Sequence, residues 1–207
     1  MKLDSNSLHG VIAAIVTPFT DNQELDEEGM KILVDFLVEG RVHGIMTTGG
    51  NGEFPNLLPR ERMRTLEVVL ERTKTHLPVL ACVSACGTRE SIIYSKHAQD
   101  QGASGIILTP PYYFDLPSNS IFQHFNDVAG SVDIPVVAYN NPAYTRHNID
   151  PLLMEKLSNI DGMIGAKQSH VDISQLIEMI RLSGEKISVL TGIDSQFYPG
   201  LCVGGRG

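Results

Sequence analysis

One lysine stands alone at the end of an uncharged and largely apolar run. Residues 162–169 read GMIGAKQS, and Lys167 is the only charged residue among them. Such a run has the composition of a buried strand, where a charge has no structural use. Burial lowers the pKa of a lysine because the charged form loses hydration, so this amine can be neutral and nucleophilic near neutral pH. We predict that Lys167 forms a Schiff base with a ketone or an aldehyde.

Polar and aromatic residues follow four other apolar runs. They are GGNGE at 49–53, PPYYF at 110–114, YNNP at 139–142 and GID at 192–194. The glycines of 49–53 would let backbone N–H groups approach a carboxylate closely, although an ordinary glycine-rich loop has the same composition. A tyrosine hydroxyl near a reacting carbon can transfer a proton, although paired aromatics are more often packing residues. These segments become partners of Lys167 only if the fold brings them together.

The chain that must position these segments alternates between two patterns. Short apolar, β-branched runs predict strands, and longer segments with helical periodicity predict helices. This alternation is typical of parallel strands joined by crossover helices. The expected strands are 11–17, 44–48, 78–84, 105–110, 135–140, 163–167 and 188–192, and the expected helices are 26–39, 59–75, 89–101, 118–131, 151–157, 173–183 and 195–202.

The predicted fold is α/β, a (β/α)8 TIM barrel with about seven of its eight units in this chain. No Gly-x-Gly-x-x-Gly turn follows the first strand, which argues against a doubly wound sheet. Residues 1–207 are expected to form a single, incomplete barrel domain, because the chain stops near the place where an eighth strand should begin. Without that strand, the edges of the first and seventh strands would be exposed. In a barrel of this kind the candidate residues meet at the C-terminal ends of the strands.

The composition limits the classes of partner. The net charge is −8, and no dense Lys/Arg run is present, which argues against a nucleic-acid or membrane-surface partner and for a small molecule. No apolar stretch approaches the roughly 20 residues of a membrane span, so we expect a cytoplasmic protein. The cysteines, Cys82, Cys86 and Cys202, are expected to be buried free thiols. Since no second Cys or His pair follows them, no metal site and no cofactor are predicted.

The motifs, taken in order, resemble the dihydrodipicolinate synthase and N-acetylneuraminate lyase superfamily of class I aldolases. The resemblance covers almost the whole chain. It rests on TPF at 17–19, the 49–53 loop, PYY at 111–113, YNNP at 139–142, GAKQ at 165–168, GID at 192–194 and GGRG at 204–207. It implies a TIM barrel whose lysine forms an imine with pyruvate or a related 2-oxo acid, without a metal or cofactor.

The resemblance also implies roles for individual residues. Lys167 would be the Schiff-base lysine and Tyr139 the acid/base that moves the proton. Gly50 and Asn51 stand where the superfamily usually has Ser/Thr-Thr, so a hydroxyl relay to Tyr139 would be lost, although the turn could still bind the 2-oxo acid carboxylate. Tyr112 or Tyr113 matches the tyrosine that crosses a dimer interface, which implies a homodimer or homotetramer. Tyr113 is accordingly a candidate catalytic residue, and the expected substrate-binding residues are Gly50, Asn51, Tyr112, Gly192 and Asp194.

The sequence says less about the part of the substrate that would become the aldehyde. Tyr144 stands where dihydrodipicolinate synthases have a carboxylate-binding arginine, and Arg146 would have to substitute for it. Gln168, Ser169 and Asp194 look more like the branches that act on keto-deoxy sugar acids. Asp194 would bind a sugar hydroxyl or cap the next helix. We therefore expect a Schiff-base lyase or aldolase that acts on pyruvate or a related 2-oxo acid, such as a 2-keto-3-deoxy sugar acid, with an imine-dependent dehydratase or dihydrodipicolinate synthase as variants. The alternative is a catalytically silent homologue or interaction protein.

Overall fold

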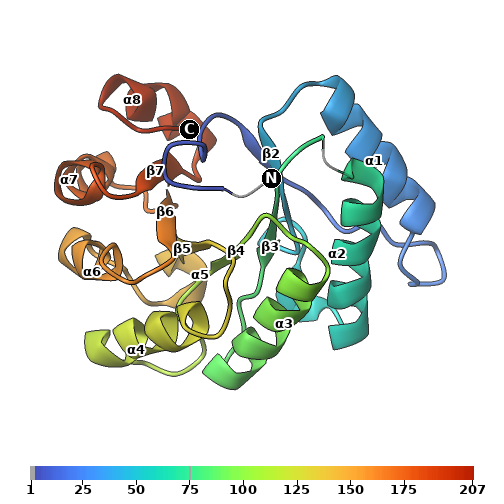
Figure 1. Ribbon diagram of the computed structural model, residues 1–207, viewed down its shortest axis with the longest axis horizontal. Coiled ribbons are helices and arrows are strands. Elements are labelled where there is room, and N and C mark those ends of the chain that lie inside the picture. The colour runs from blue at the N-terminus through green and yellow to red at the C-terminus, as the bar shows by residue number, and fades with distance from the viewer. Residues whose placement is uncertain (1–2, 75) are drawn as a thin grey trace.

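Seven parallel strands form one curved sheet in the computed structural model, which describes residues 3–74 and 76–207. The strands pair in sequence order, and Figure 1 shows them at the centre of the molecule. They are β1 (Ile12–Ala14), β2 (Gly44–Thr47), β3 (Val79–Cys82), β4 (Gly105–Leu108), β5 (Val136–Asn140), β6 (Met163–Gln168) and β7 (Ser188–Thr191). This arrangement confirms the predicted α/β barrel with about seven of eight units.

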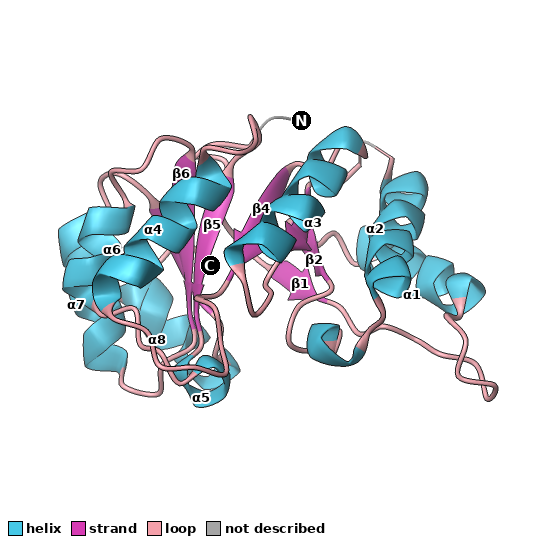
Figure 2. Ribbon diagram, turned by 90° about the horizontal axis from the view of Figure 1, so that it is seen from below, coloured by secondary structure: helices cyan, strands magenta, loops and turns pink. Residues whose placement is uncertain are grey.

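The helices lie outside the sheet, as Figures 1 and 2 show. They are α1 (Glu27–Glu39), α2 (Pro59–Thr73), α3 (Thr88–Asp100), α4 (Ser118–Ala129), α6 (Pro151–Leu157), α7 (Ile173–Ser183) and α8 (Phe197–Cys202). The expected end of the second helix, residue 75, lies outside the described residues. Three short helices lie between these elements. Two of them, η1 (Phe54–Asn56) and α5 (Pro142–Thr145), were not predicted, and the third, η2 (Asp194–Gln196), overlaps the start of the predicted helix 195–202. All three lie in loops that follow the C-terminal ends of strands, where the candidate site was expected.

Both faces of the sheet are buried, which explains why the strands read as continuous apolar runs. Side chains on the outer face, such as Ile45, Ile106 and Val136, pack in one cluster against the helices. The inner face contributes a second cluster, which includes Met46, Leu80, Cys82, Ile107, Val137, Tyr139 and Leu190. Leu3 and Leu8 of the N-terminal segment belong to this inner cluster. The inner cluster therefore forms the floor beneath Lys167.

The last two residues occupy the beginning of the eighth strand position. Arg206 N donates to Val189 O at 2.8 Å, and Thr191 N donates to Gly207 O at 2.9 Å, so this segment pairs with β7. On its other side, Gly10 N donates to Arg206 O at 2.7 Å. Arg206 and Gly207 thus bridge β7 to the residues that precede β1. The edges are thus joined at this end, whereas, among the described residues, Ile12–Ala14 of β1 pair only with β2 and stay partly exposed, as expected for an edge strand.

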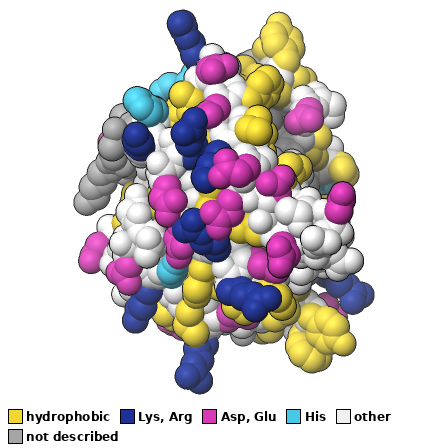
Figure 3. Space-filling view, turned by 90° about the vertical axis from the view of Figure 1, so that its right-hand side faces the viewer, with side chains coloured by type: hydrophobic (Ala, Val, Ile, Leu, Met, Phe, Trp, Pro, Cys, Tyr) yellow, Lys and Arg dark blue, Asp and Glu magenta, His cyan; other side chains and the backbone are white. Residues whose placement is uncertain are grey.

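The outer surface over α1 and α2 mixes acidic and basic side chains, as Figure 3 shows. Arg64 of α2 contacts Glu27 of α1 at 2.7 Å and also contacts Glu67 and Glu71. Arg72 and Asp35 form a second pair between these helices. Because solvent screens exposed charges, pairs of this kind contribute little to the stability of the fold. These charged side chains therefore form the solvated outer surface of α1 and α2, away from the apolar interior.

The prediction of three buried thiols was wrong for two of them. Cys82 is buried in β3, whereas Cys86 and Cys202 are exposed. Cys86 lies in the loop after β3, and Cys202 ends the outer helix α8. Apolar neighbours in the sequence therefore did not predict the burial of these two side chains. Within the described ranges, no group of three or more His, Cys, Asp or Glu side chains is arranged to hold a metal ion. None of the helices described is long and apolar enough to cross a bilayer.

Candidate active site

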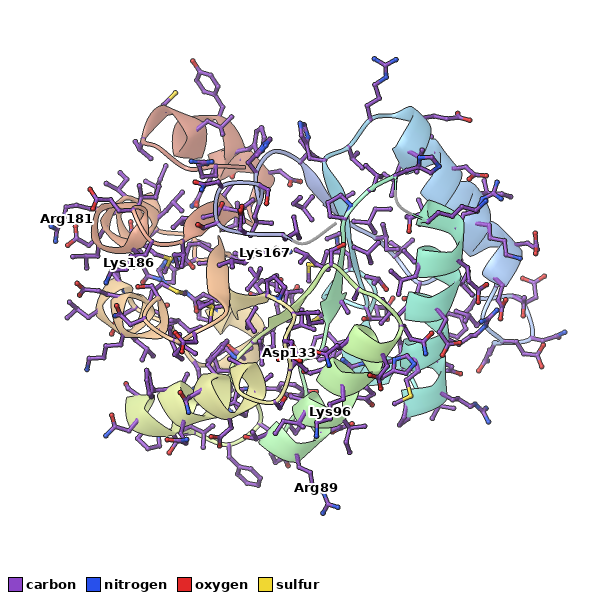
Figure 4. The ribbon with its side chains drawn as sticks, in the orientation of Figure 1. Arg89, Lys96, Asp133, Lys167, Arg181 and Lys186 are labelled. Atoms are coloured by element: carbon purple, nitrogen blue, oxygen red, sulfur yellow. The ribbon has the colours of Figure 1, made fainter. Side chains whose placement is uncertain are left out.

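Lys167 lies on the inner face of the barrel, and Figure 4 shows it inside the ring of helices. In the register of β5 and β6, Tyr139 pairs with Lys167 and Asn140 pairs with Gln168. Successive side chains of a strand point to opposite faces, so Tyr139 and Lys167 share the interior. Asn140 and Gln168 are fully buried on the other face, where Asn140 Nδ2 donates to Gln168 Oε1 at 2.7 Å. This amide pair holds the two strands in the register that places the phenol beside the amine.

The amine of Lys167 lies in apolar surroundings. Its Nζ is 3.6 Å from Met46 Sδ and 4.5 Å from the centroid of the Tyr139 ring. Burial lowers the pKa of Lys167, and the nearby Cys82 and Asp194 partly oppose this change. The lowered pKa increases the fraction of neutral, nucleophilic amine at a given pH. The structure therefore supports the environment that the sequence predicted for this lysine.

Tyr139 is the phenol next to that amine, with only 5 % of its surface exposed. Burial raises its pKa, and a hydrogen bond from Asn141 acts in the opposite direction. Asn141 Nδ2 donates to Tyr139 Oη at 2.9 Å. A phenol so close to Lys167 can deliver a proton to the carbon next to an imine carbon, and its phenolate can accept one from that carbon.

The loop at 49–53 lies across the cavity from these two residues. A Cβ atom at Gly50 would lie 3.7 Å from Tyr139 Oη, so Gly50 faces the phenol directly. Asn51 Nδ2 donates to Ala14 O at 3.1 Å, which ties the loop to β1 and occupies one of its two N–H groups. Thr17 Oγ1 donates to Gly52 O at 2.9 Å and holds the loop from the same side. The loop is thus fixed in place beside Tyr139.

The two neighbouring tyrosines occupy different environments. Tyr112 is partly buried, lines the cavity and packs edge-on against Phe54, with ring centroids 5.9 Å apart. The guanidinium of Arg62 in turn lies over the rings of Phe54 and Tyr94. Tyr113, in contrast, is 75 % exposed and is not among the residues that line the cavity. The structure therefore brings Tyr112, and not Tyr113, into the site formed by this chain.

A cavity of about 700 Å³ joins the candidate residues. Lys167, Tyr139, Gly50, Asn51, Tyr112, Gly192 and Asp194 all line it. Arg146 lies outside this lining, while Tyr144 belongs to it. Asp194 begins η2, whose N-cap is Ile193, and no side-chain cap is formed there. The capping alternative for Asp194 is therefore not supported, and its carboxylate faces the cavity.

Sequence reasoning missed several residues that the fold brings to the cavity. Asn141 and Thr109 line it, as does Phe54 of η1, and so does Ser169, which the sequence marked only as a feature of the sugar-acid branches. The Ser169 Oγ atom is buried and has no hydrogen-bond partner within the described part of the chain. Asn141 and Ser169 each lie two residues beyond a predicted catalytic residue, and the period of two along a strand could have flagged them.

Gly192 makes a close approach that only glycine permits. A Cβ atom there would lie 2.7 Å from Lys167 Cε and closer still to Ser169 Oγ. We expect Gly192→Ala to displace the Lys167 side chain and to slow imine formation about 100-fold, because a misplacement of about 1 Å has effects of that size. The measurement is the rate of borohydride-trapped adduct with pyruvate. Gly87→Ala, where an added Cβ would meet no atom within 4 Å, is the matched control. Equal rates for both variants would contradict the assigned contact.

Comparison with known proteins agrees with this geometry. The model of the Dihydrodipicolinate synthetase family matches residues 7–207. The 4-hydroxy-tetrahydrodipicolinate synthase of Syntrophobacter fumaroxidans is 36% identical over 198 residues, covering 96% of this chain and 68% of the relative. An uncharacterized DapA-like lyase of Halobacterium salinarum is 34% identical over 204 residues, covering 99% of this chain and 67% of the relative.

Solved structures show the same likeness. Dihydrodipicolinate synthase from Aquifex aeolicus superposes with a TM-score of 0.93 at 32% identity, over 97% of this chain and 68% of that chain. YagE, a prophage protein of the dihydrodipicolinic acid synthase family from E. coli K12 solved in complex with pyruvate, gives a TM-score of 0.94 at 32% identity, over 97% of this chain and 68% of that chain. The chain thus spans about two thirds of these relatives' lengths.

Proposed function

We propose that this chain, which belongs to the dihydrodipicolinate synthetase family, is a Schiff-base lyase acting on pyruvate or a related 2-oxo acid. The observation that carries the proposal is the desolvated amine of Lys167 beside the Tyr139 phenol in one cavity. YagE, which was solved with pyruvate, has the same fold. The alternative of a silent interaction protein gains no support from this arrangement.

The residues suit an aldol reaction through an imine. Neutral Lys167 Nζ attacks the C2 carbonyl of the 2-oxo acid, and the carbinolamine takes up a proton and loses water to give a protonated imine. The cationic imine accepts the electron pair when the C3–C4 bond breaks, which gives an enamine and an aldehyde. As the phenolate, Tyr139 would accept the proton from the C4 hydroxyl during cleavage, and the phenol so formed would give a proton to C3 of the enamine. Hydrolysis of the resulting imine releases pyruvate and restores the amine.

The 49–53 loop is the proposed carboxylate site. Gly50 and Asn51 lie across from Tyr139 and line the same cavity as Lys167. Backbone N–H groups of such a turn, with the second N–H of the Asn51 amide, can hold the carboxylate that adjoins the reacting carbonyl. This contact would place C2 of the substrate next to Nζ.

For the aldehyde half we propose a hydroxylated chain, as in a 2-keto-3-deoxy sugar acid. Asp194 and Ser169 line the cavity and can bind hydroxyl groups, whereas Arg146 does not reach it. A 4-hydroxy-tetrahydrodipicolinate synthase activity is the second candidate, because the relatives at 34–36% identity include enzymes with that name. An imine-dependent dehydratase would use the same lysine and phenol. A turnover screen of keto-deoxy sugar acids against pyruvate plus aspartate semialdehyde distinguishes these candidates.

A homodimer or homotetramer in the cytoplasm remains part of the proposal. The exposed rings of Tyr113 and Phe114 pack against each other with centroids 4.9 Å apart, outside the cavity of their own chain. Exposed aromatic pairs of this kind are typical of protein interfaces. Contact with a second copy would give Tyr113 the interfacial role implied by its sequence position.

Trapping of the imine tests the proposal directly. We expect incubation of the purified protein with pyruvate, followed by borohydride, to leave a reduced adduct on Lys167 that mass spectrometry can locate. Lactate, which has no carbonyl group to attack, is the matched control. If the folded protein gives no adduct with pyruvate or with the other 2-oxo acids of the screen, the proposed chemistry is wrong.

A further inference from the structure

We propose that the Asn141 amide is the positioning group for the Tyr139 phenol. The inference rests on the proposed function, because it assigns a task within the same imine chemistry. Asn141 acts on the phenol and is therefore a positioning residue.

The side chain of Asn141 is committed to Tyr139. Its Nδ2 donates to Tyr139 Oη at 2.9 Å, and both side chains are buried, with 8 % and 5 % exposed. Asn141 stands at the N-cap of α5, yet it forms no side-chain cap there. An asparagine at that position commonly accepts a hydrogen bond from the helix N-terminus. Here Pro142 occupies the first helical position, and the Asn141 side chain turns to the phenol instead.

The backbone of Asn141 is also held firmly. Its carbonyl oxygen accepts hydrogen bonds from Thr145 N and Thr145 Oγ1, both at 3.0 Å, and from Tyr144 N at 3.2 Å. These bonds fix the position from which the amide reaches Tyr139. An ordered donor holds the phenol ring in one orientation at little entropic cost on substrate binding.

The direction of the hydrogen bond has a chemical consequence. Tyr139 Oη accepts from the amide, which leaves its own hydroxyl proton free for another acceptor. An amide N–H does not exchange protons readily, so Asn141 orients the phenol without relaying its proton. The same donor stabilises the phenolate and opposes the effect of burial, which raises the Tyr139 pKa.

Gly50 provides the complementary half of this arrangement. A Cβ atom there would lie 3.7 Å from Tyr139 Oη and would meet no other heavy atom within 4 Å. A serine at this position therefore fits the space, and its hydroxyl would come within hydrogen-bond distance of the phenol. The amide of Asn141 approaches the phenol from one side, and a hydroxyl at position 50 would approach it from the 49–53 loop.

The test separates imine formation from proton transfer. Borohydride trapping with pyruvate reports the imine on Lys167, and exchange of the pyruvate C3 hydrogens with deuterium in D2O reports the transfer assigned to Tyr139. For Asn141→Ala we expect unchanged trapping, with exchange about 10-fold slower and its pH midpoint moved upward by about one unit, the size expected for a lost hydrogen bond to a charged oxygen. The other ionisable groups facing Tyr139 are Lys167, Cys82 and Tyr144, which the variant retains.

Three further variants test whether a donor to the phenol is what matters. Asn141→Asp keeps the size but replaces the donor with an acceptor, and we expect exchange as slow as in Asn141→Ala. Adding Gly50→Ser to Asn141→Ala should restore at least part of the exchange, whereas adding Gly50→Ala should not. The exposed Asn126, changed to alanine, is the matched control and should behave as the unmodified protein.

The possible failures are distinguishable. If the unmodified protein gives no trapped adduct, the proposed function itself fails. If it gives an adduct but Asn141→Ala and Asn141→Asp, both folded by circular dichroism, exchange deuterium at the unmodified rate and midpoint, the role of Asn141 is overturned. Equal exchange in the serine and alanine double variants would likewise overturn the claim that a donor to the phenol is what matters.

Discussion

Lys167→Met should abolish trapping of pyruvate and stabilise the fold at neutral pH. Methionine retains the length and apolar contacts of the side chain, but it has no nitrogen to form an imine, so the expected loss of adduct is complete. The stabilisation follows from burial, which lowers the pKa of Lys167 in the folded state. Around neutral pH the unfolded chain holds this proton more tightly than the folded chain does, so removing the amine favours folding.

The pH dependence has a definite sign. Between the folded pKa of Lys167 and the unfolded value of about 10.4, the unfolded chain binds more protons, so stability rises with pH in this window. The advantage of Lys167→Met should therefore be largest at neutral pH and shrink as the pH approaches the unfolded value. Thermal unfolding at several pH values measures it. The trapping rate of the unmodified protein should rise with pH and reach half its maximum below the pKa of a free lysine.

A second lysine provides the matched control. Lys96 is exposed on α3, and Figure 4 shows it on the outer helix layer. Lys96→Met should leave both the adduct and its pH profile unchanged. An adduct that persists in Lys167→Met would contradict the assignment of the nucleophile, and a melting temperature lowered at neutral pH would contradict the desolvated amine.

Tyr139→Phe should lower turnover about 100-fold or more while the imine still forms. Phenylalanine keeps the ring beside Lys167 but removes the group that moves the proton, and general acid/base groups typically contribute factors of this size. Deuterium exchange at C3 of pyruvate should slow to a similar extent. The pyruvate concentration that half-saturates trapping should change little, because the phenol is assigned to the proton-transfer step.

The variant also has a structural consequence to control for. It leaves Asn141 Nδ2 without its acceptor, which should destabilise the fold by about 1–3 kcal/mol if water does not replace it. Tyr94→Phe is the matched control, because Tyr94 is buried and donates to Glu90 at 3.0 Å outside the cavity. Turnover of Tyr139→Phe equal to that of Tyr94→Phe would remove Tyr139 from the mechanism.

Much of the fold was predictable from the chain. All seven observed strands fall within or one residue beyond the predicted ranges, because strands buried on both faces read as apolar runs. The first strand was predicted too long, since 11–17 contains only the three paired residues Ile12–Ala14. Beyond these residues, Thr17 binds the 49–53 loop. An apolar sequence pattern does not show whether a residue pairs with a neighbouring strand or contacts a loop.

The short helices were not predictable in the same way. Segments η1, α5 and η2 are three or four residues long, too short to show a helical period. Their positions depend on contacts made after the barrel has formed. Cys82 and Cys86 have similar local sequences, yet Cys82 is buried and Cys86 is exposed. The difference arises because Cys82 lies in a strand and Cys86 in the loop that follows it.

The sequence by itself determined the nature of the chemistry. A lone lysine at the end of an apolar strand, in an ordered set of strand-end motifs, was enough to predict the nucleophile, the phenol and the family. These features are local or follow from chain order, and the rule that strand ends share one edge of a barrel gathers them.

Only the tertiary structure decided which side chains reach the amine. It placed Tyr112 in the cavity and Tyr113 outside it, turned Asn141 toward Tyr139, and brought Gly192 against Lys167. These outcomes depend on distances between residues that lie on different strands and loops. A sequence pattern gives the face on which a side chain lies, while the curvature of the sheet and the packing of its loops set how close two such side chains come.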